Sequence, residues 1–257
     1  MVLDFSKNNG VGIIKFNRPD KFNSFTQKLA LAVQNALDDC EKDETIRVII
    51  ITGEGKAFCA GQDLVEATDP NGPALKDIVK KHYNPIIERI RNIEKPVIAA
   101  VNGVAAGAGA NIALACDVVI AKQSAKFIQA FSSIGLIPDS GGTFFLPRLV
   151  GMQKAMALML TGDRVSADEA EAMNMIYKSV EDDGFDAFVS SFSRKVAQMP
   201  TLGLGLTKRA LNNTFNNNLS QQLALEEELQ TLAGNSHDFK EGTTAFLEKR
   251  KPEFKGK

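Results

Sequence analysis

Short apolar runs alternate with longer amphipathic segments from the start of the chain. Val11 to Phe16 and Val48 to Thr52 are rich in β-branched and aromatic residues, as strands are. Between them, apolar residues recur at intervals of three and four, which is the spacing of a helix with one buried face. These residues are Leu29, Val33, Ala36, Leu37 and Cys40. The pattern predicts a β-α-β unit.

The same alternation continues further along the chain. The apolar run Val97 to Val101 follows a long helical region that ends near Ile93, and Val118 to Ala121 follows an alanine-rich segment that starts at the glycines near position 107. Strands that alternate with helices form parallel sheets with crossover helices. An α/β fold with a parallel sheet is therefore expected.

Beyond Gly151 the pattern becomes mainly helical, apart from a strand predicted at Ile176 to Val180. Pro200 and the asparagine-rich stretch 212–218 separate the predicted helices, and the chain closes with a polar, lysine-rich segment. We therefore divide the chain into an α/β core, residues 1–195, and a helical C-terminal portion, residues 196–257.

The composition is that of an ordinary globular protein. Hydrophobic residues make up 44% and charged residues 24% of the 257 positions, and no apolar run approaches the roughly 18 residues of a membrane span. The 30 basic and 31 acidic side chains nearly cancel. Since no excess of positive charge attracts nucleic acid or an anionic bilayer, neither is expected as a partner.

Cysteine and histidine usage narrows the chemistry. The three cysteines show no CxxC spacing, which argues against a disulfide framework or a zinc site. Residues 1–5 lack the basic and apolar regions of a secretory signal, so a reducing cytoplasm is the expected location. With only two histidines, a Ser/His/Asp triad or a multi-histidine metal site has little material to draw on.

Two segments of small residues follow predicted strands. Lys56 to Leu64 comes after the strand that ends at Thr52, and Asn102 to Asn111 comes after the strand that ends at Val101. The carboxyl ends of parallel strands are where α/β sheets place ligands, and small residues let a ligand approach the backbone. The second segment leads into a helix whose free N–H groups favour negative charge. Taken singly, either segment could instead be a tight turn or a close helix contact.

Together these segments resemble the two oxyanion-hole segments of the crotonase (enoyl-CoA hydratase/isomerase) superfamily. Three further matches extend the resemblance over almost the whole chain: Asn17-Arg18-Pro19-Asp20-Lys21-Phe22-Asn23-Ser24, Ile137-Pro138-Asp139-Ser140-Gly141-Gly142-Thr143, and Glu241-Gly242 with Ala245 to Lys251. The resemblance implies a crotonase-like spiral of β-β-α units with a helical C-terminal trimerisation region. It also implies a homotrimer or hexamer.

In that family the carbonyl oxygen of an acyl-CoA thioester accepts hydrogen bonds from two main-chain N–H groups. By motif position these belong to Ala60 and Ala108. Removing a proton next to a thioester carbonyl places negative charge on its oxygen, and fixed donors stabilise the resulting enolate. Coenzyme A is then part of the substrate, and no metal or redox cofactor is expected.

The acid or base beside this hole distinguishes members of the family. Hydratases that this chain resembles use two glutamates, and the corresponding positions here are Asn111 and Phe131, neither of which can act as a base. Asp139 lies where several isomerases of the superfamily carry their acidic residue. One carboxylate can take a proton from one carbon and return it two carbons away. The alternative is that Asp139 caps the helix predicted at Phe144 to Val150.

The resemblance also assigns contacts with the substrate. Around the adenine and pantetheine it places Lys21, Phe22, Ser24, Lys56 and Ala57. The resemblance also implies that Phe246 and Lys249 of a neighbouring subunit contact the nucleotide. The remaining contacts are Phe58, Gly61, Gln62, Asp63, Leu64, Gly107, Asn111 and Phe131. For the tail lysines the alternative is a solvated surface, and for Asp63 we expect a loop-capping role. We expect Tyr83 and His82 on an ordinary helix face, with the acyl pocket as the alternative.

Within the superfamily, segments 59–64, 105–110 and 135–148 look most like the branch that isomerises 1,2-epoxyphenylacetyl-CoA in bacterial phenylacetate degradation. Phe144 departs from a tryptophan often found there, which leaves the shape of the acyl pocket open. Three alternatives remain. They are a straight-chain Δ3,Δ2-enoyl-CoA isomerase of fatty acid oxidation, an enoyl-CoA hydratase whose water is placed by Asp139, and a non-catalytic protein that binds acyl-CoA or RNA.

Overall fold

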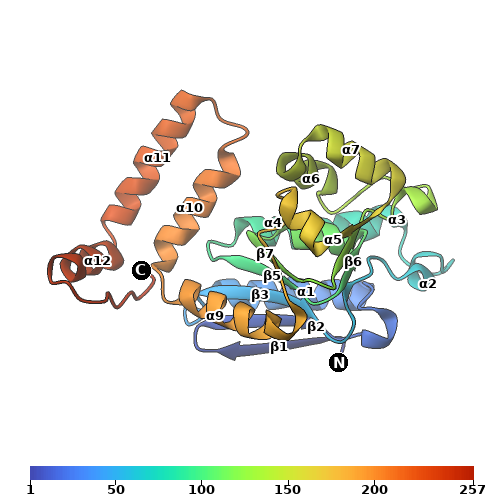
Figure 1. Cartoon of the computed structure of the whole chain (residues 1–257), viewed down its shortest axis with the longest axis horizontal. Helices are drawn as coiled ribbons and strands as arrows, with labels where there is room; N and C mark the ends of the chain where they lie inside the picture. The colour runs from blue at the N-terminus through green and yellow to red at the C-terminus, as the bar shows by residue number, and fades with distance from the viewer.

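Two β-sheets with helices around them form the larger part of the molecule in the computed structural model, which describes residues 1–257 (Figure 1). The six-stranded sheet has the order β1 (Leu3–Asn8), β2 (Val11–Phe16), β3 (Val48–Gly53), β5 (Val97–Val101), β7 (Val118–Lys122), β10 (Lys178–Val180). The four-stranded sheet has the order β4 (Ala57–Cys59), β6 (Val104–Ala106), β8 (Lys126–Ile128), β9 (Arg164–Ser166). Only β1 and β9 pair with their neighbours in antiparallel fashion.

The helices fall into a group around the sheets and a group beside them. The first group is α1 (Gln27–Lys42), α2 (Leu64–Ala67), α3 (Leu75–Asp77), α4 (Asn84–Asn92), α5 (Ala108–Ala115), α6 (Gly142–Val150), α7 (Met152–Thr161), α8 (Ala167–Ala172) and α9 (Phe185–Ala197). The second group is α10 (Thr201–Asn213), α11 (Leu219–Gly234) and α12 (His237–Leu247). A π-helical stretch, Ile78–Tyr83, joins α3 to α4.

The predicted strands and the first β-α-β unit are confirmed. Strands β2 and β3 pair in parallel and are joined by α1, whose buried face carries the expected apolar residues. The predicted strand at Ile176 to Val180 is shorter, because Tyr177 lies outside β10. The expectation of only one strand after Gly151 was wrong, since β9 also lies there. A three-residue strand is too short to leave a periodic signal.

The six-stranded sheet is covered on both faces. On one face 42 buried residues form the main core, and on the other α9 packs Phe185, Val189 and Ala197 against β2, β3, β5 and β7. Helix α5 is buried along its whole length, because its alanines and single glycine let it lie close to its neighbours. Two-sided burial explains why β3 and β5 are almost uninterrupted apolar runs.

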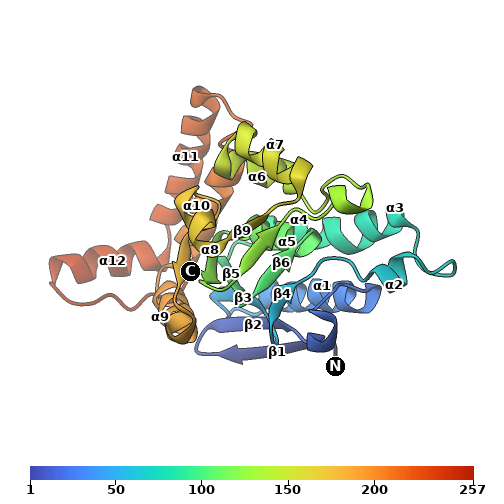
Figure 2. The ribbon, with the colours of Figure 1, turned by 45° about the vertical axis from the view of Figure 1, so that its right-hand side comes forward.

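Helices α10 to α12 form an arm beside the sheets (Figures 1 and 2). Lys208 on α10 anchors the arm: its Nζ pairs with Asp117 at 2.8 Å and donates to the carbonyl of Ile90 at 2.6 Å. The chain end returns to the core, where Arg47 donates to the carbonyl of Phe254 at 2.7 Å. The predicted division between residues 195 and 196 falls inside the last turn of α9, and the arm begins at Thr201.

None of the helices combines the length and apolar character that crossing a bilayer requires.

Candidate active site

The two small-residue loops lie against each other, as their places after β3 and β5 predict. Gly61 follows β4 and Gly107 follows β6, and both have positive φ, +89° and +52°. A Cβ on Gly61 would lie 3.0 Å from the carbonyl oxygen of Ala106 and 3.5 Å from the nitrogen of Ala108. Only glycine combines this backbone conformation with such a close approach.

The main-chain N–H of Ala108 lies at the N-terminal end of α5. Ala108 is the first residue of α5, so its N–H has no acceptor within that helix. The N–H of the preceding residue, Gly107, has an acceptor, because it donates to the carbonyl of Ile128 at 2.9 Å. The positive end of the helix dipole also lies here, so this position favours developing negative charge.

The second predicted donor, the N–H of Ala60, has an acceptor within the protein. The N–H of Ala60 donates to the carbonyl of Phe22 at 2.9 Å, so it is not free in this structure. Phe22 has a positive φ of 47° and is 53% exposed. The turn carbonyl satisfies a donor that would otherwise lack a partner. Of the two predicted N–H groups, the one on Ala60 therefore already has an acceptor in this structure.

The turn that carries Phe22 is tied to the loop by side chains. Asn23 is fully buried and donates from Nδ2 to the carbonyls of Ala57, at 2.7 Å, and Glu54, at 2.9 Å. Arg18 pairs with Asp63 at 2.8 Å, and Asp63 accepts the N–H of Val65 as the N-cap of α2. The expectation that Asp63 caps and orients its loop is confirmed.

Asp139 lies in the turn before α6 and does not cap that helix. The N-cap of α6 is Gly141, and no side chain bonds to the first turn. The Asp139 carboxylate instead accepts the hydroxyl of Ser140 at 2.9 Å. Burial raises the pKa of Asp139, and the Ser140 hydroxyl partly opposes that rise. A raised pKa brings a carboxylate closer to the proton affinity that a general base needs.

Asn111 has a different contact from the one predicted. It is fully buried, its Nδ2 donates to the carbonyl of Asp139 at 2.9 Å, and its Oδ1 accepts Nε2 of Gln129 at 2.9 Å. Because its carboxamide is used in these two bonds, Asn111 supports the Asp139 turn rather than presenting a free group to a substrate. The sequence pattern gave no signal for Gln129, a buried polar residue just after β8.

Phe131 is buried beside the second loop. Its ring lies 3.8 Å from the position that a Cβ on Gly107 would occupy. An aromatic ring thus stands beside the loop, at a position where the resemblance places a glutamate in hydratases. The surroundings of Gly107 are therefore apolar on the side of Phe131.

Tyr83 reaches the first loop from the π-helical stretch. It is 1% exposed, and its hydroxyl donates to Oε1 of Gln62 at 2.7 Å. Burial raises the pKa of Tyr83, and the nearby Cys59 and Asp139 add to the rise. His82 is also buried. The expectation of an ordinary helix face, in the core or on the surface, is confirmed for both residues, and that face lies in the core. Tyr83 in addition contacts a loop residue of the site.

Two residues predicted to contact the substrate have side chains in the core. Ala57 and Phe58 are buried in β4, with the Phe58 ring packed edge-to-face on Phe16 at 5.4 Å, so their side chains belong to the core and cannot contact a nucleotide. Four other predicted contact residues have exposed side chains on the two loops and the turn. These residues are Lys21, Phe22, Lys56 and Leu64. Ser24 is buried against Asp63, at 3.5 Å.

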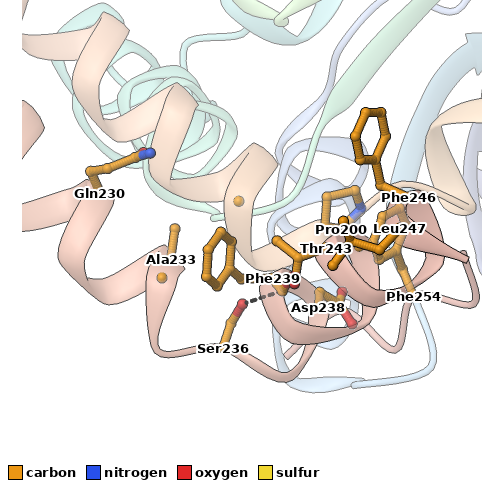
Figure 3. Close-up of a pocket in the computed structure, with 13 residues that line it drawn as sticks. Pro200, Gln230, Ala233, Ser236, Asp238, Phe239, Thr243, Phe246, Leu247 and Phe254 are labelled. Carbon is orange, nitrogen blue, oxygen red and sulfur yellow. Dashed lines mark hydrogen bonds between the residues drawn. The ribbon is translucent and has the colours of Figure 1, made fainter.

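Phe246 and Lys249 are not brought to the site of their own chain. Phe246 is near the C-terminal end of α12 and Lys249 follows that helix, and α12 lies on the opposite side of the molecule from α2 (Figure 2). Phe246 is 82% exposed there. It also borders a groove of about 800 Å³ among α10, α11, α12 and the chain end, with Phe239, Leu247 and Phe254 (Figure 3). This groove contains neither Asp139 nor the loops.

Comparisons with known proteins identify the family of the chain. Residues 6–257 match the family described as enoyl-CoA hydratase/isomerase. The chain is 48% identical over 251 residues to the 1,2-epoxyphenylacetyl-CoA isomerase of Escherichia coli K12, covering 96% of each chain. It is 36% identical to the mitochondrial enoyl-CoA hydratase of Pongo abelii, covering 97% of this chain and 85% of that one.

A solved structure shares the fold over the whole length. The crystal structure of an enoyl-CoA hydratase from Bacillus anthracis superposes with a TM-score of 0.93 at 33% identity, covering 100% of both chains. The crotonase-like architecture expected from the motifs is thereby confirmed. This chain belongs to the enoyl-CoA hydratase/isomerase family.

Proposed function

We propose that this protein is an acyl-CoA isomerase that acts on 1,2-epoxyphenylacetyl-CoA, with Asp139 as the proton-transferring group. The observation that carries the proposal is the site of Asp139, a half-buried carboxylate in the turn before α6 whose pKa is raised by burial. The two residues at the glutamate positions of hydratases, Asn111 and Phe131, offer no second carboxylate.

The chemistry follows from these positions. The Asp139 carboxylate takes a proton from a carbon of the acyl group, and the charge moves onto the thioester oxygen. That oxygen binds the N–H of Ala108, and also the N–H of Ala60 once the Phe22 carbonyl has moved away. Each such donor contributes roughly 3–4 kcal/mol to transition-state stabilisation. Protonated Asp139 then returns the proton to a different carbon. In the epoxide, the bond between the two epoxide carbons breaks as the ring expands around the oxygen, so the reaction is an isomerisation without any net loss or gain of atoms.

Two observations support a ring substrate. The relative from Escherichia coli, 48% identical over nearly the whole chain, is named for this epoxide. The Phe131 ring beside Gly107 provides an aromatic wall against which a ring can pack.

The test is a comparison of three substrates with the purified protein. Loss of the epoxide from 1,2-epoxyphenylacetyl-CoA, conversion of a 3-enoyl-CoA to the 2-enoyl-CoA, and hydration of crotonyl-CoA are followed at matched concentrations. The proposal expects the highest kcat/KM for the epoxide. If the straight-chain substrate is isomerised faster, the protein is instead a fatty-acid enoyl-CoA isomerase. If crotonyl-CoA is hydrated faster, it is a hydratase in which Asp139 places the water.

A non-catalytic role in binding acyl-CoA or RNA is the alternative of another class. Turnover of none of the three substrates, together with tight binding of acyl-CoA or salt-dependent binding of RNA, would favour it. The net charge of -1 weighs against RNA.

We further propose a homotrimer or hexamer in which residues 196–257 mediate assembly and Phe246 and Lys249 reach the nucleotide of a neighbouring subunit. The arm exposes apolar side chains along its length, those of Leu211, Phe215, Leu219, Leu223, Leu232, Phe239, Phe246 and Leu247. Light scattering after size exclusion measures the mass, and a monomer at assay concentration would contradict the proposal.

We also propose that the reaction requires no metal or redox cofactor and takes place in the cytoplasm. Dialysis against a chelator should leave the epoxide assay unchanged. The three cysteines are unpaired and buried, which suits a reducing compartment.

A further inference from the structure

Amide hydrogen bonds join α5, the end of β8 and the backbone of the Asp139 turn. Gln129, just after β8, donates from Nε2 to Oδ1 of Asn111 on α5 at 2.9 Å. Asn111 donates from Nδ2 to the main-chain carbonyl of Asp139 at 2.9 Å. Gln129 and Asn111 are 2% and 0% exposed, so water does not compete for these bonds.

Only one orientation of the two carboxamides satisfies this chain of bonds. The Asp139 carbonyl can only accept, so Asn111 must turn its NH₂ group toward it and its oxygen toward Gln129. Gln129 must then present its own NH₂ group. Its Oε1 is left buried without a partner, which is a cost that the arrangement tolerates.

Packing holds Asn111 in this position. Its carboxamide fills the space that a side chain on Gly142, the first residue of α6, would occupy. Within this buried space the carboxamide can rotate by exchanging its oxygen and nitrogen, because the two groups have nearly the same size. The hydrogen bond from Gln129 decides which of the two faces the Asp139 carbonyl.

We propose that Gln129 is a positioning residue for the base: it fixes the orientation of Asn111, which holds the backbone of the Asp139 turn so that the carboxylate faces the acyl group. The inference rests on the proposed role of Asp139. It assigns to Asn111 and Gln129 a part in the reaction that needs no contact with the substrate.

The variant Gln129→Glu tests the orientation directly. A protonated glutamic acid can donate to Oδ1 of Asn111 as the amide does, whereas an ionised glutamate repels that oxygen and favours the reversed amide. Burial without a cation raises the pKa of a carboxyl, so the change should occur within the assay range. The ionisable groups Asp139, Tyr83 and Cys59 of the site are all present in the wild type, whose profile is subtracted.

The expected result is a new loss of kcat with rising pH. At low pH Gln129→Glu should approach the wild-type rate, and at high pH it should be slower by roughly tenfold or more. KM should change little, because no substrate contact is removed. Gln153→Glu, an exposed glutamine on α7, should follow the wild-type profile.

A second variant keeps the test decisive if the first folds poorly. In Gln129→Met the new side chain has a similar size and no hydrogen-bond donor. This variant should lower kcat at every pH, without the additional loss at high pH expected for Gln129→Glu. Wild-type kcat and pH profiles in both Gln129 variants would overturn the positioning role while leaving the proposed function standing. Full activity in Asp139→Asn would instead remove the proposed base itself.

Discussion

The α-carbon of Gly61 faces the main-chain nitrogen of Ala108 so closely that a methyl group on Gly61 would lie 3.5 Å from it. The same methyl group would lie 3.0 Å from the carbonyl oxygen of Ala106. Two loops that are more than 40 residues apart thus share one small space, in which the proposed site receives the thioester oxygen.

Gly61→Ala should therefore impair both folding and activity. The positive φ at this position costs a non-glycine residue about 1–3 kcal/mol of unfolding free energy. The added methyl group displaces the loop in front of Ala108, so kcat should fall by about 100-fold, the loss expected for one oxyanion donor. Denaturant unfolding and the isomerase assay measure the two effects.

Gly234→Ala is the matched control. No atom lies within 4 Å of the added methyl group, and Gly234 has a helical position in α11. This variant should keep full activity and gain up to about 1 kcal/mol in stability. Equal activity of the Gly61 and Gly234 variants would contradict the place assigned to Gly61.

Asp139→Asn should reduce activity and increase stability. Loss of a general base typically costs about 10²- to 10⁴-fold in rate. Since burial raises the pKa of Asp139 above its value in the unfolded chain, the folded state binds this proton more tightly. The contribution of Asp139 to stability is therefore greatest below the unfolded-chain pKa and is lost as pH rises through the folded pKa.

The asparagine variant avoids that loss, so its melting temperature should exceed the wild-type value at neutral pH, and the difference should shrink on acidification. Asp163→Asn, at an exposed position, is the control and should change neither quantity. A pH-independent difference in melting temperature would show that the ionised carboxylate is not what destabilises the protein.

Ser140 should influence the pH below which kcat/KM falls. Its hydroxyl donates to the Asp139 carboxylate at 2.9 Å and lowers the pKa of Asp139 against the effect of burial. Removal of the hydroxyl raises that pKa. Because the base acts in its ionised form, kcat/KM of Ser140→Ala should begin to fall at a higher pH than in the wild type.

Ser140→Gly separates this effect from backbone strain. Ser140 has a φ of 51°, which glycine adopts without cost. Both variants should shift the acid limb in the same direction, while only the glycine variant relieves the backbone. Superimposable pH profiles for all three proteins would exclude a role of the hydroxyl at the base.

Tyr83→Phe should loosen the loop that contains Gln62. The lost hydrogen bond, 2.7 Å in length, is worth about 1 kcal/mol, so kcat/KM should fall roughly fivefold. Tyr177→Phe is the natural control, because Tyr177 is the only other tyrosine and is 57% exposed. Equal kcat/KM in both variants would mean that the Gln62 side chain does not need its partner.

The sequence by itself determined the alternation of strands and helices, the two small-residue loops and the single acidic residue in the turn before α6. These features are local. Periodicity along β2, α1 and β3 reports which face is buried, and a glycine after a strand reports a backbone conformation at that residue. The motif resemblance then gave the roles of Ala60, Ala108 and Asp139, which stay proposals.

Only the tertiary structure decided how these parts face one another. The Phe22 carbonyl accepts the N–H of Ala60, and Asn111 donates to the main-chain carbonyl of Asp139. The Phe58 side chain is buried in the core. Each of these outcomes depends on hydrogen bonds or packing between segments that lie far apart in the chain. Residue type and spacing state that a polar group needs a partner, but the fold chooses which partner comes within reach.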